Sequence, residues 1–198
     1  MKKLVLLFGI LLMAFQAGNA QDATSRTANV GIKGGYNLAA VSLDDDDNAD
    51  TGNRSGFHIG VYGESFLNQN ISLQLELLYS QQGYEIEANG GTFTQKLDYI
   101  NLPLMLKGYL ADSFFLEVGP QIGVAISHKE EFDSNFNLFD TSQEFEPNSF
   151  DYGVNFGAGF KTGTGISFSA RYHLGLGDIY DDGSPKNRVW LFSVGFDL

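Results

Sequence analysis

The segment from Tyr99 to Ser127 constrains the fold more than any other part of the sequence. Apolar side chains occupy every second position of its first arm, 100–106, and alternate positions of its second arm, 116–126. The short stretch 111–113 between the arms is small and polar. A two-residue period predicts β-strands, so the segment is expected to form a β-hairpin.

The two faces of this hairpin predict where it lies. One face is apolar along its whole length, whereas the other carries glycine, glutamine and single charges. Such a wall suits lipid on the outside and a narrow polar lumen on the inside. We therefore expect an all-β fold, an eight-stranded antiparallel up-and-down transmembrane β-barrel. A soluble eight-stranded barrel such as a lipocalin is the alternative, with the apolar face inside and lysine or glutamate outside.

The rest of the chain repeats the same pattern, and the connections alternate in length. Eight strands are predicted, at 29–38, 56–66, 71–84, 94–110, 114–127, 152–161, 165–175 and 188–198. Short turns are predicted at 67–70, 111–113 and 162–164, and long loops at 39–55, 85–93, 128–151 and 176–187. Outer-membrane barrels have short turns on the periplasmic side and long loops on the exterior.

The first residues predict export. Two lysines precede the apolar stretch 4–15, and small residues stand just before Gln21. This is the pattern of a secretory signal peptide, and the apolar stretch is too short to span a membrane as a helix. We expect residues 1–20 to be cleaved and residues 21–198 to form one barrel domain.

Composition narrows the function classes. The chain has 24 glycines, 17 phenylalanines and 9 tyrosines, which fits curved strands with aromatic girdles. It has no cysteine, so neither disulfides nor thiolate metal sites are expected. The net charge is −12, and it becomes −14 when the two lysines of the leader are removed. Nucleic-acid binding is not expected, because no basic stripe is present.

Charged residues at inward-facing strand positions form the first candidate site. Four positive and four negative side chains are expected in the lumen: Lys33, Lys107, Lys161 and Arg171, with Glu64, Glu76, Glu117 and Asp197. A pore or proton-linked gate lined by some of them is one hypothesis. We favour a plug of paired charges, because an eight-stranded barrel is just wide enough for side chains to fill it.

The predicted loops carry most of the negative charge. The first loop contains an acidic run, Asp44, Asp45, Asp46, Asp47 and Asp50. Carboxylates suit calcium, or divalent ions that bridge lipopolysaccharide. The run lacks the spacing of an EF-hand loop, so the favoured interpretation is a solvated acidic loop. No cofactor and no dedicated metal site are predicted.

Histidines and aromatic residues give two further candidates. His58, His128 and His173 suggest a lipid-modifying enzyme as one hypothesis, with hydrogen bonding inside the barrel as the favoured one. Aromatic residues at strand ends predict interfacial girdles: Phe57, Tyr99, Phe114, Tyr152, Phe160 and Trp190.

Several segments, in order along the chain, carry a family resemblance. They are GIKGGYNLA, YINLPLMLKGYL, FFLEVGPQIGVAIS, DYGVNFGAGF, RYHLGLGDI and RVWLFSVGFDL. Together they resemble the outer-membrane β-barrel family of Bacteroidota, the porin-family or PorT-like small barrels. The resemblance implies an eight-stranded barrel in the bacterial outer membrane and carries no catalytic motif. The last segment also resembles the C-terminal signal that barrel-insertion machinery recognises.

The expected function follows from these features. We expect a non-enzymatic, monomeric barrel with a plugged lumen, in contact with outer-membrane lipid and lipopolysaccharide. Its acidic loops would meet a protein or small-molecule ligand. A small-solute channel is the alternative, and a lipid-modifying enzyme is the third hypothesis.

Overall fold

The structure is a computed structural model, and it describes residues 28–42, 51–88, 91–134, 141–143, 150–178 and 186–198. Nine strands are present in these residues: β1 (Asn29–Ser42), β2 (Thr51–Phe66), β3 (Ile71–Ala88), β4 (Gly91–Tyr109), β5 (Phe114–Ser134), β6 (Thr141–Gln143), β7 (Phe150–Lys161), β8 (Ile166–Asp178) and β9 (Lys186–Asp197). No helix among the described residues is long and apolar enough to cross a membrane.

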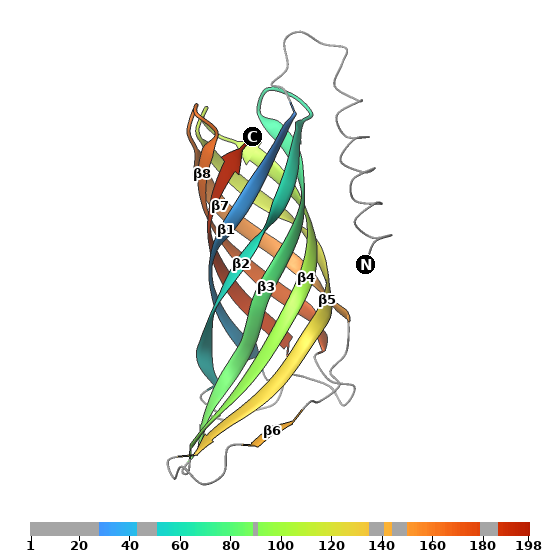
Figure 1. Cartoon of the computed structure of the whole chain (residues 1–198). Helices are drawn as coiled ribbons and strands as arrows, with labels where there is room; N and C mark the ends of the chain where they lie inside the picture. Colours follow the sequence, from blue (N-terminus) through green and yellow to red (C-terminus); the bar gives the residue numbers. More distant parts are fainter. Residues whose placement is uncertain (1–27, 43–50, 89–90, 135–140, 144–149, 179–185) are drawn as a thin grey trace.

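Eight of these strands form a closed ring. Each pairs antiparallel with its neighbours in chain order, and β5 pairs directly with β7. The ring closes between the first and last strands, where β1 pairs with β9 from Gly31↔Asp197 to Ser42↔Lys186. Strand β6 stands outside the ring and, within the residues that the structure describes, pairs with the end of β5. The predicted eight-stranded antiparallel barrel is therefore confirmed (Figure 1).

Tight turns connect the strands at one end of the barrel, which we call the turn end. In each of the three predicted turns the backbone N–H before the turn donates to a carbonyl four residues later: Leu67 to Ile71, Leu110 to Phe114, and Thr162 to Ile166. The last turn includes Gly165 at φ +84°, a conformation that favours glycine. Opposite lies the loop end, where β3, β4 and β5 project beyond the other strands (Figure 1).

Strands extend into all four predicted loops, most fully into 85–93. Strands β3 and β4 stay paired as far as Ala88↔Gly91, so most of the predicted loop 85–93 is a hairpin extension. Strand β5 continues to Ser134 through the first part of the predicted loop 128–151, which also contains β6. Backbone pairing between neighbouring strands continues beyond the part of the wall whose outer face is apolar. The hydropathy of the residues alone does not predict that pairing.

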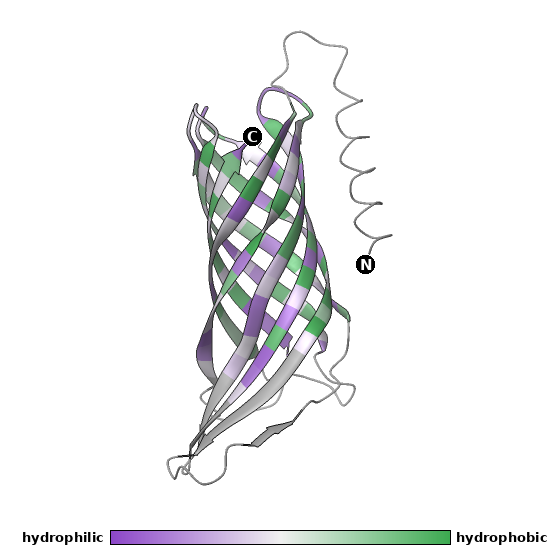
Figure 2. Ribbon diagram, in the orientation of Figure 1, coloured by the Kyte–Doolittle hydropathy of each residue, from purple (hydrophilic) through white to green (hydrophobic). Residues whose placement is uncertain are grey.

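Side chains alternate between the two faces of the wall, as the two-residue period predicts. On β5, Gln121 is 4% exposed and Ile122 is 46% exposed. The outer face carries exposed aromatic or aliphatic side chains on every barrel strand, and purple and green alternate along the ribbons in Figure 2. The apolar face thus points away from the barrel axis, the reverse of the arrangement expected of a lipocalin.

The prediction of an aromatic girdle fails for one of its six residues. Five of the six aromatic residues lie on the outer face, but Tyr99 is only 1% exposed and points into the barrel. Tyr99 stands two residues before the inward Asn101, so strand alternation places both on the interior face. The girdle prediction for Tyr99 was wrong because position at a strand end is a weaker indicator than alternation.

Candidate functional site: the polar lumen

The eight charges expected in the lumen lie on the interior face of the barrel, one from each strand of the ring. Along the chain they are Lys33, Glu64, Glu76, Lys107, Glu117, Lys161, Arg171 and Asp197. Six of them are at most 7% exposed, and the side chains of Lys161 and Asp197 are 11% and 17% exposed. Hydrogen bonds and ion pairs join all eight.

Arg171 is the centre of the first group, which we call the central cluster. Its Nε and Nη2 donate to the two carboxylate oxygens of Glu117 at 2.8 and 3.0 Å. Its Nη1 and Nη2 donate to the two oxygens of Glu76, both at 2.8 Å. Lys33 completes the cluster with its Nζ 3.0 Å from Glu76 Oε1. A planar guanidinium that meets two carboxylates in this way makes strong, geometrically specific bonds.

Glu64 is the centre of the second group, the turn-side cluster. Its carboxylate accepts from Lys161 Nζ, from the Tyr109 hydroxyl and from the Ser72 hydroxyl, each at 2.7 Å. Lys107 Nζ lies 3.8 Å away. Four donors therefore surround a carboxylate that is 1% exposed, which offsets the cost of burying its charge.

Asp197 completes the turn-side cluster at the end of β9. Its carboxylate lies 2.9 Å from Lys161 Nζ and accepts from the Tyr62 hydroxyl at 2.7 Å. Lys161 therefore bridges Glu64 and Asp197. This bridge links β2, β7 and β9 just inside the turn end.

Gln74 joins the two clusters. Its amide nitrogen donates to Glu76 Oε1, and its amide oxygen accepts from Lys107 Nζ at 2.6 Å. Each cluster contains two positive and two negative side chains, so each is formally neutral. No sequence pattern singles out Gln74, although its inward position follows from the alternation along β3.

The clusters use alternate strands. In ring order, the central cluster comes from β1, β3, β5 and β8, and the turn-side cluster comes from β2, β4, β7 and β9. Tilted strands in a barrel stack their inward side chains in layers drawn from every second strand. Two such layers of four charges each therefore lie next to one another along the lumen.

His58 lies between the central cluster and the loop end and is fully hydrogen-bonded. The Asn37 amide nitrogen donates to Ser80 Oγ and to the Gln81 carbonyl, so the Asn37 oxygen accepts from His58 Nδ1 at 2.7 Å. His58 Nε2 then accepts from the Ser193 hydroxyl at 2.9 Å. The Ser193 hydroxyl, the His58 imidazole and the Asn37 amide therefore lie within the hydrogen-bond distances that a nucleophile and its base require. Ser193 is nevertheless buried on the lumen face, 6% exposed.

His173 lies farther toward the loop end. Its Nδ1 is 2.9 Å from Asn155 Oδ1, and its Nε2 is 3.4 Å from Asp151 Oδ2. The sequence placed Asp151 in a loop, whereas the structure places it on β7, 4% exposed and facing the interior. Alternation from Asn155 back through β7 would have found it. His173 and His58 lie in separate hydrogen-bonded groups.

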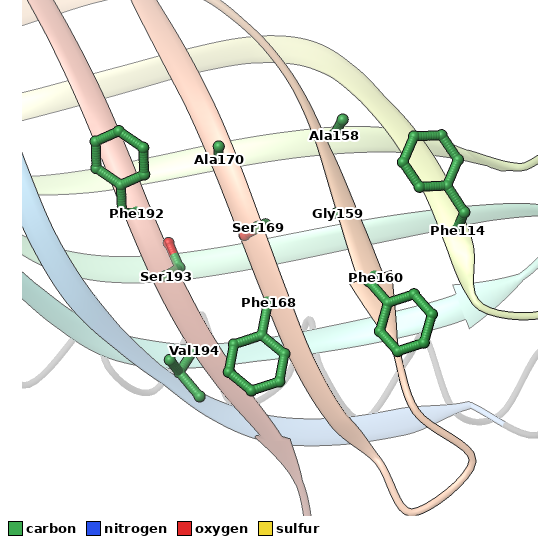
Figure 3. Close-up of a pocket in the computed structure, with 10 residues that line it drawn as sticks. All are labelled: Phe114, Ala158, Gly159, Phe160, Phe168, Ser169, Ala170, Phe192, Ser193 and Val194. Carbon is green, nitrogen blue, oxygen red and sulfur yellow. The ribbon is translucent and has the colours of Figure 1, made fainter.

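The outer wall also carries an apolar hollow of about 500 Å³ (Figure 3). Figure 3 shows small side chains, such as Ala158 and Ala170, between the rings of Phe114, Phe160 and Phe192. The hollow lies on the lipid-facing side of β5, β7, β8 and β9 and has no charged residue in its lining. Its aromatic and aliphatic lining offers contact with hydrocarbon.

Other candidate sites from the sequence lie outside the residues that the structure describes. The acidic run at Asp44, Asp45, Asp46, Asp47 and Asp50 lies outside the described residues, as does the side chain of His128. The predicted signal peptide, residues 1–20, is outside them as well.

The geometry defines a class of protein. A closed antiparallel ring with an apolar outer face and a hydrogen-bonded, charged interior is a transmembrane β-barrel. A family model, outer membrane protein beta-barrel domain, matches residues 19–181. The chain belongs to this family, and it is a protein of the bacterial outer membrane.

Solved structures share the fold. Ail, the attachment invasion locus protein of Yersinia pestis, in complex with the heparin analogue sucrose octasulfate, is 19% identical and covers 86% of this chain and 99% of its own, with a TM-score of 0.51. Neisserial surface protein A (NspA) is 15% identical over 87% of this chain and 99% of its own, with a TM-score of 0.52. No curated protein matches the sequence significantly. These similarities establish the outer-membrane barrel fold.

Proposed function

We propose that this protein is a non-conducting outer-membrane barrel, closed by paired side chains in its lumen, that acts through its exposed loops. The observation that carries the proposal is the joined network of eight charges across the central and turn-side clusters. Arg171 on β8 and Glu76 on β3 come from opposite sides of the ring. A hydrated ion would have to break several charge-assisted hydrogen bonds to pass between them.

The proposed orientation places the turn end in the periplasm and the loop end outside the cell. Short turns face the periplasm in barrels of this kind. The finer assignment to the Bacteroidota-type, PorT-like small barrels, the signal peptide at residues 1–20, insertion through the C-terminal strand and a monomeric state are parts of the same proposal.

The acidic loop sequences set the chemistry of the proposed partner. A protein or small-molecule ligand with positive charge, or lipopolysaccharide bridged by divalent cations, complements them. The Ail structure contains a heparin analogue, which is a polyanion. A net charge of −12 disfavours a polyanionic ligand for this chain.

Single-channel recording tests the plug. The mature chain is refolded into planar bilayers, and insertion is verified by the heat-dependent shift in gel migration of the folded barrel. We expect no discrete current steps from the wild type. We expect measurable steps from a double variant that carries Glu117→Ala and Arg171→Ala. Reproducible steps from the wild type would support the channel instead, and neutralising Lys107 or Glu117 would then change its ion selectivity.

Loop deletion tests the interaction role. Removing residues 130–146 is expected to abolish adhesion or partner binding while the barrel still folds. A phenotype that persists shows that this loop is not the interface.

The contact between Ser193 and His58 is the one observation that favours an enzyme. Identical lipid A profiles from cells with the wild type and with His58→Gln plus His173→Gln would dismiss that alternative.

A further inference from the structure

The buried side-chain atoms that lack a hydrogen-bond partner in the described residues include Asp151 Oδ2, His173 Nε2 and Asn101 Oδ1. The three residues are 4%, 1% and 1% exposed, and they come from β7, β8 and β4. A buried polar atom without a partner is costly, so these three atoms are candidate ligand contacts.

The hydrogen bonds of Asn155 determine what His173 can offer. The Asn155 amide nitrogen donates to Gln121 Oε1 at 3.0 Å and points to Met105 Sδ at 3.8 Å. Its oxygen therefore faces His173 Nδ1 and accepts a hydrogen from it. The metal-binding form of imidazole is neutral and carries one N–H, so in that form Nε2 of His173 presents a lone pair.

That lone pair faces a second acceptor. His173 Nε2 and Asp151 Oδ2 are 3.4 Å apart with no hydrogen bond between them. Two ligands of one zinc ion, at about 2.0–2.2 Å each and a tetrahedral angle, are also separated by about 3.4 Å. The spacing suits a shared cation better than it suits two facing acceptors.

Two glycines make room for this arrangement. A Cβ at Gly153 would lie 2.7 Å from His173 Cε1, so a side chain there would displace the imidazole ring. A Cβ at Gly123 would lie 2.3 Å from Asn101 Oδ1. Gly123 pairs with both Asn101 and Asp151, so the amide oxygen lies over β5 in the same row as the carboxylate.

We propose that Asp151, His173 and Asn101 bind a divalent transition cation at the loop end of the lumen. The set contains one imidazole nitrogen and two oxygens, which suits zinc and similar metals with water in the open position. It includes an amide, and within the described part of the chain no group of three or more His, Cys, Asp or Glu side chains is placed to hold a metal ion. The site is independent of the charge clusters and of the proposed loop function.

Zinc titration of the refolded mature chain, free of any histidine tag, tests the proposal. The probe is Zn²⁺ alone, and the chain has only three histidines, so their ring resonances are readily assigned by NMR. We expect one equivalent of Zn²⁺ to shift the His173 resonances and leave those of His58 in place. Asp151→Asn and His173→Gln should weaken binding by more than the roughly 10–100-fold that loss of an outer-shell partner costs.

His58→Gln is the matched control, because His58 is also a buried lumen histidine but has both ring nitrogens occupied. It should bind Zn²⁺ like the wild type. Undiminished binding by Asp151→Asn and His173→Gln overturns the proposal, as does a shift of His128 alone. Absence of any His173 shift in the wild type at millimolar Zn²⁺ also overturns it and assigns the pair to an ordinary ion contact. The wild-type spectrum decides the question even if a variant does not refold.

Discussion

The guanidinium of Arg171 donates two hydrogen bonds of 2.8 Å to the carboxylate of Glu76 on the opposite side of the ring. The contact joins β8 to β3, which lie four strands apart in either direction around the barrel. Backbone pairing connects only adjacent strands. This side-chain contact therefore braces the barrel across its lumen.

Removal of Arg171 is expected to destabilise the barrel strongly. Arg171→Met leaves Glu76 and Glu117 buried without their main partner, at a cost of about 3–5 kcal/mol in the free energy of unfolding. Urea unfolding in lipid vesicles, followed by Trp190 fluorescence, measures the loss.

A neutralised variant controls for this interpretation. Adding Glu117→Gln to Arg171→Met removes the unpaired carboxylate and leaves Lys33 paired with Glu76, so part of the lost stability should return. A double variant that is less stable than Arg171→Met would contradict the assignment of the cost to unpaired carboxylates.

Alanine at two glycine positions on the barrel wall should affect the folded fraction differently. A Cβ at Gly35 would lie 1.9 Å from the Phe192 carbonyl oxygen on the neighbouring strand, whereas a Cβ at Gly108 has no atom within 4 Å. We expect Gly35→Ala to reduce the folded fraction on refolding and Gly108→Ala to leave it unchanged. Heat-dependent gel migration measures both, and equal yields would show that the β1–β9 closure tolerates a methyl group there.

Trp190 reports which face meets lipid. It is the only tryptophan in the chain and is 45% exposed on the outer wall, where its ring stacks near Phe192. Its emission should be quenched by lipids with brominated acyl chains and only weakly by aqueous acrylamide. Strong acrylamide quenching in the folded state would mean that this part of the wall faces water.

The strands and their faces followed from the sequence because each depends on local spacing. The alternation along 100–106 and 116–126 decided which side of the wall each residue occupies, since successive side chains in a strand point to opposite faces. The same rule places Lys107 and Glu117 inside, and it applied to Tyr99 as well, where a positional argument overrode it. The ends of β3, β4 and β5 were less predictable because strand pairing beyond the apolar belt leaves little trace in hydropathy.

Only the tertiary structure decided which inward residues meet. The sequence determined an eight-stranded outer-membrane barrel and supplied four positive and four negative interior side chains. It did not determine that Arg171 meets Glu76 and Glu117, that Gln74 joins the two clusters, or that Asp151 faces His173. Those pairings depend on the register of eight strands and on the tilt that brings alternate strands to one level, and both are set only when the ring closes.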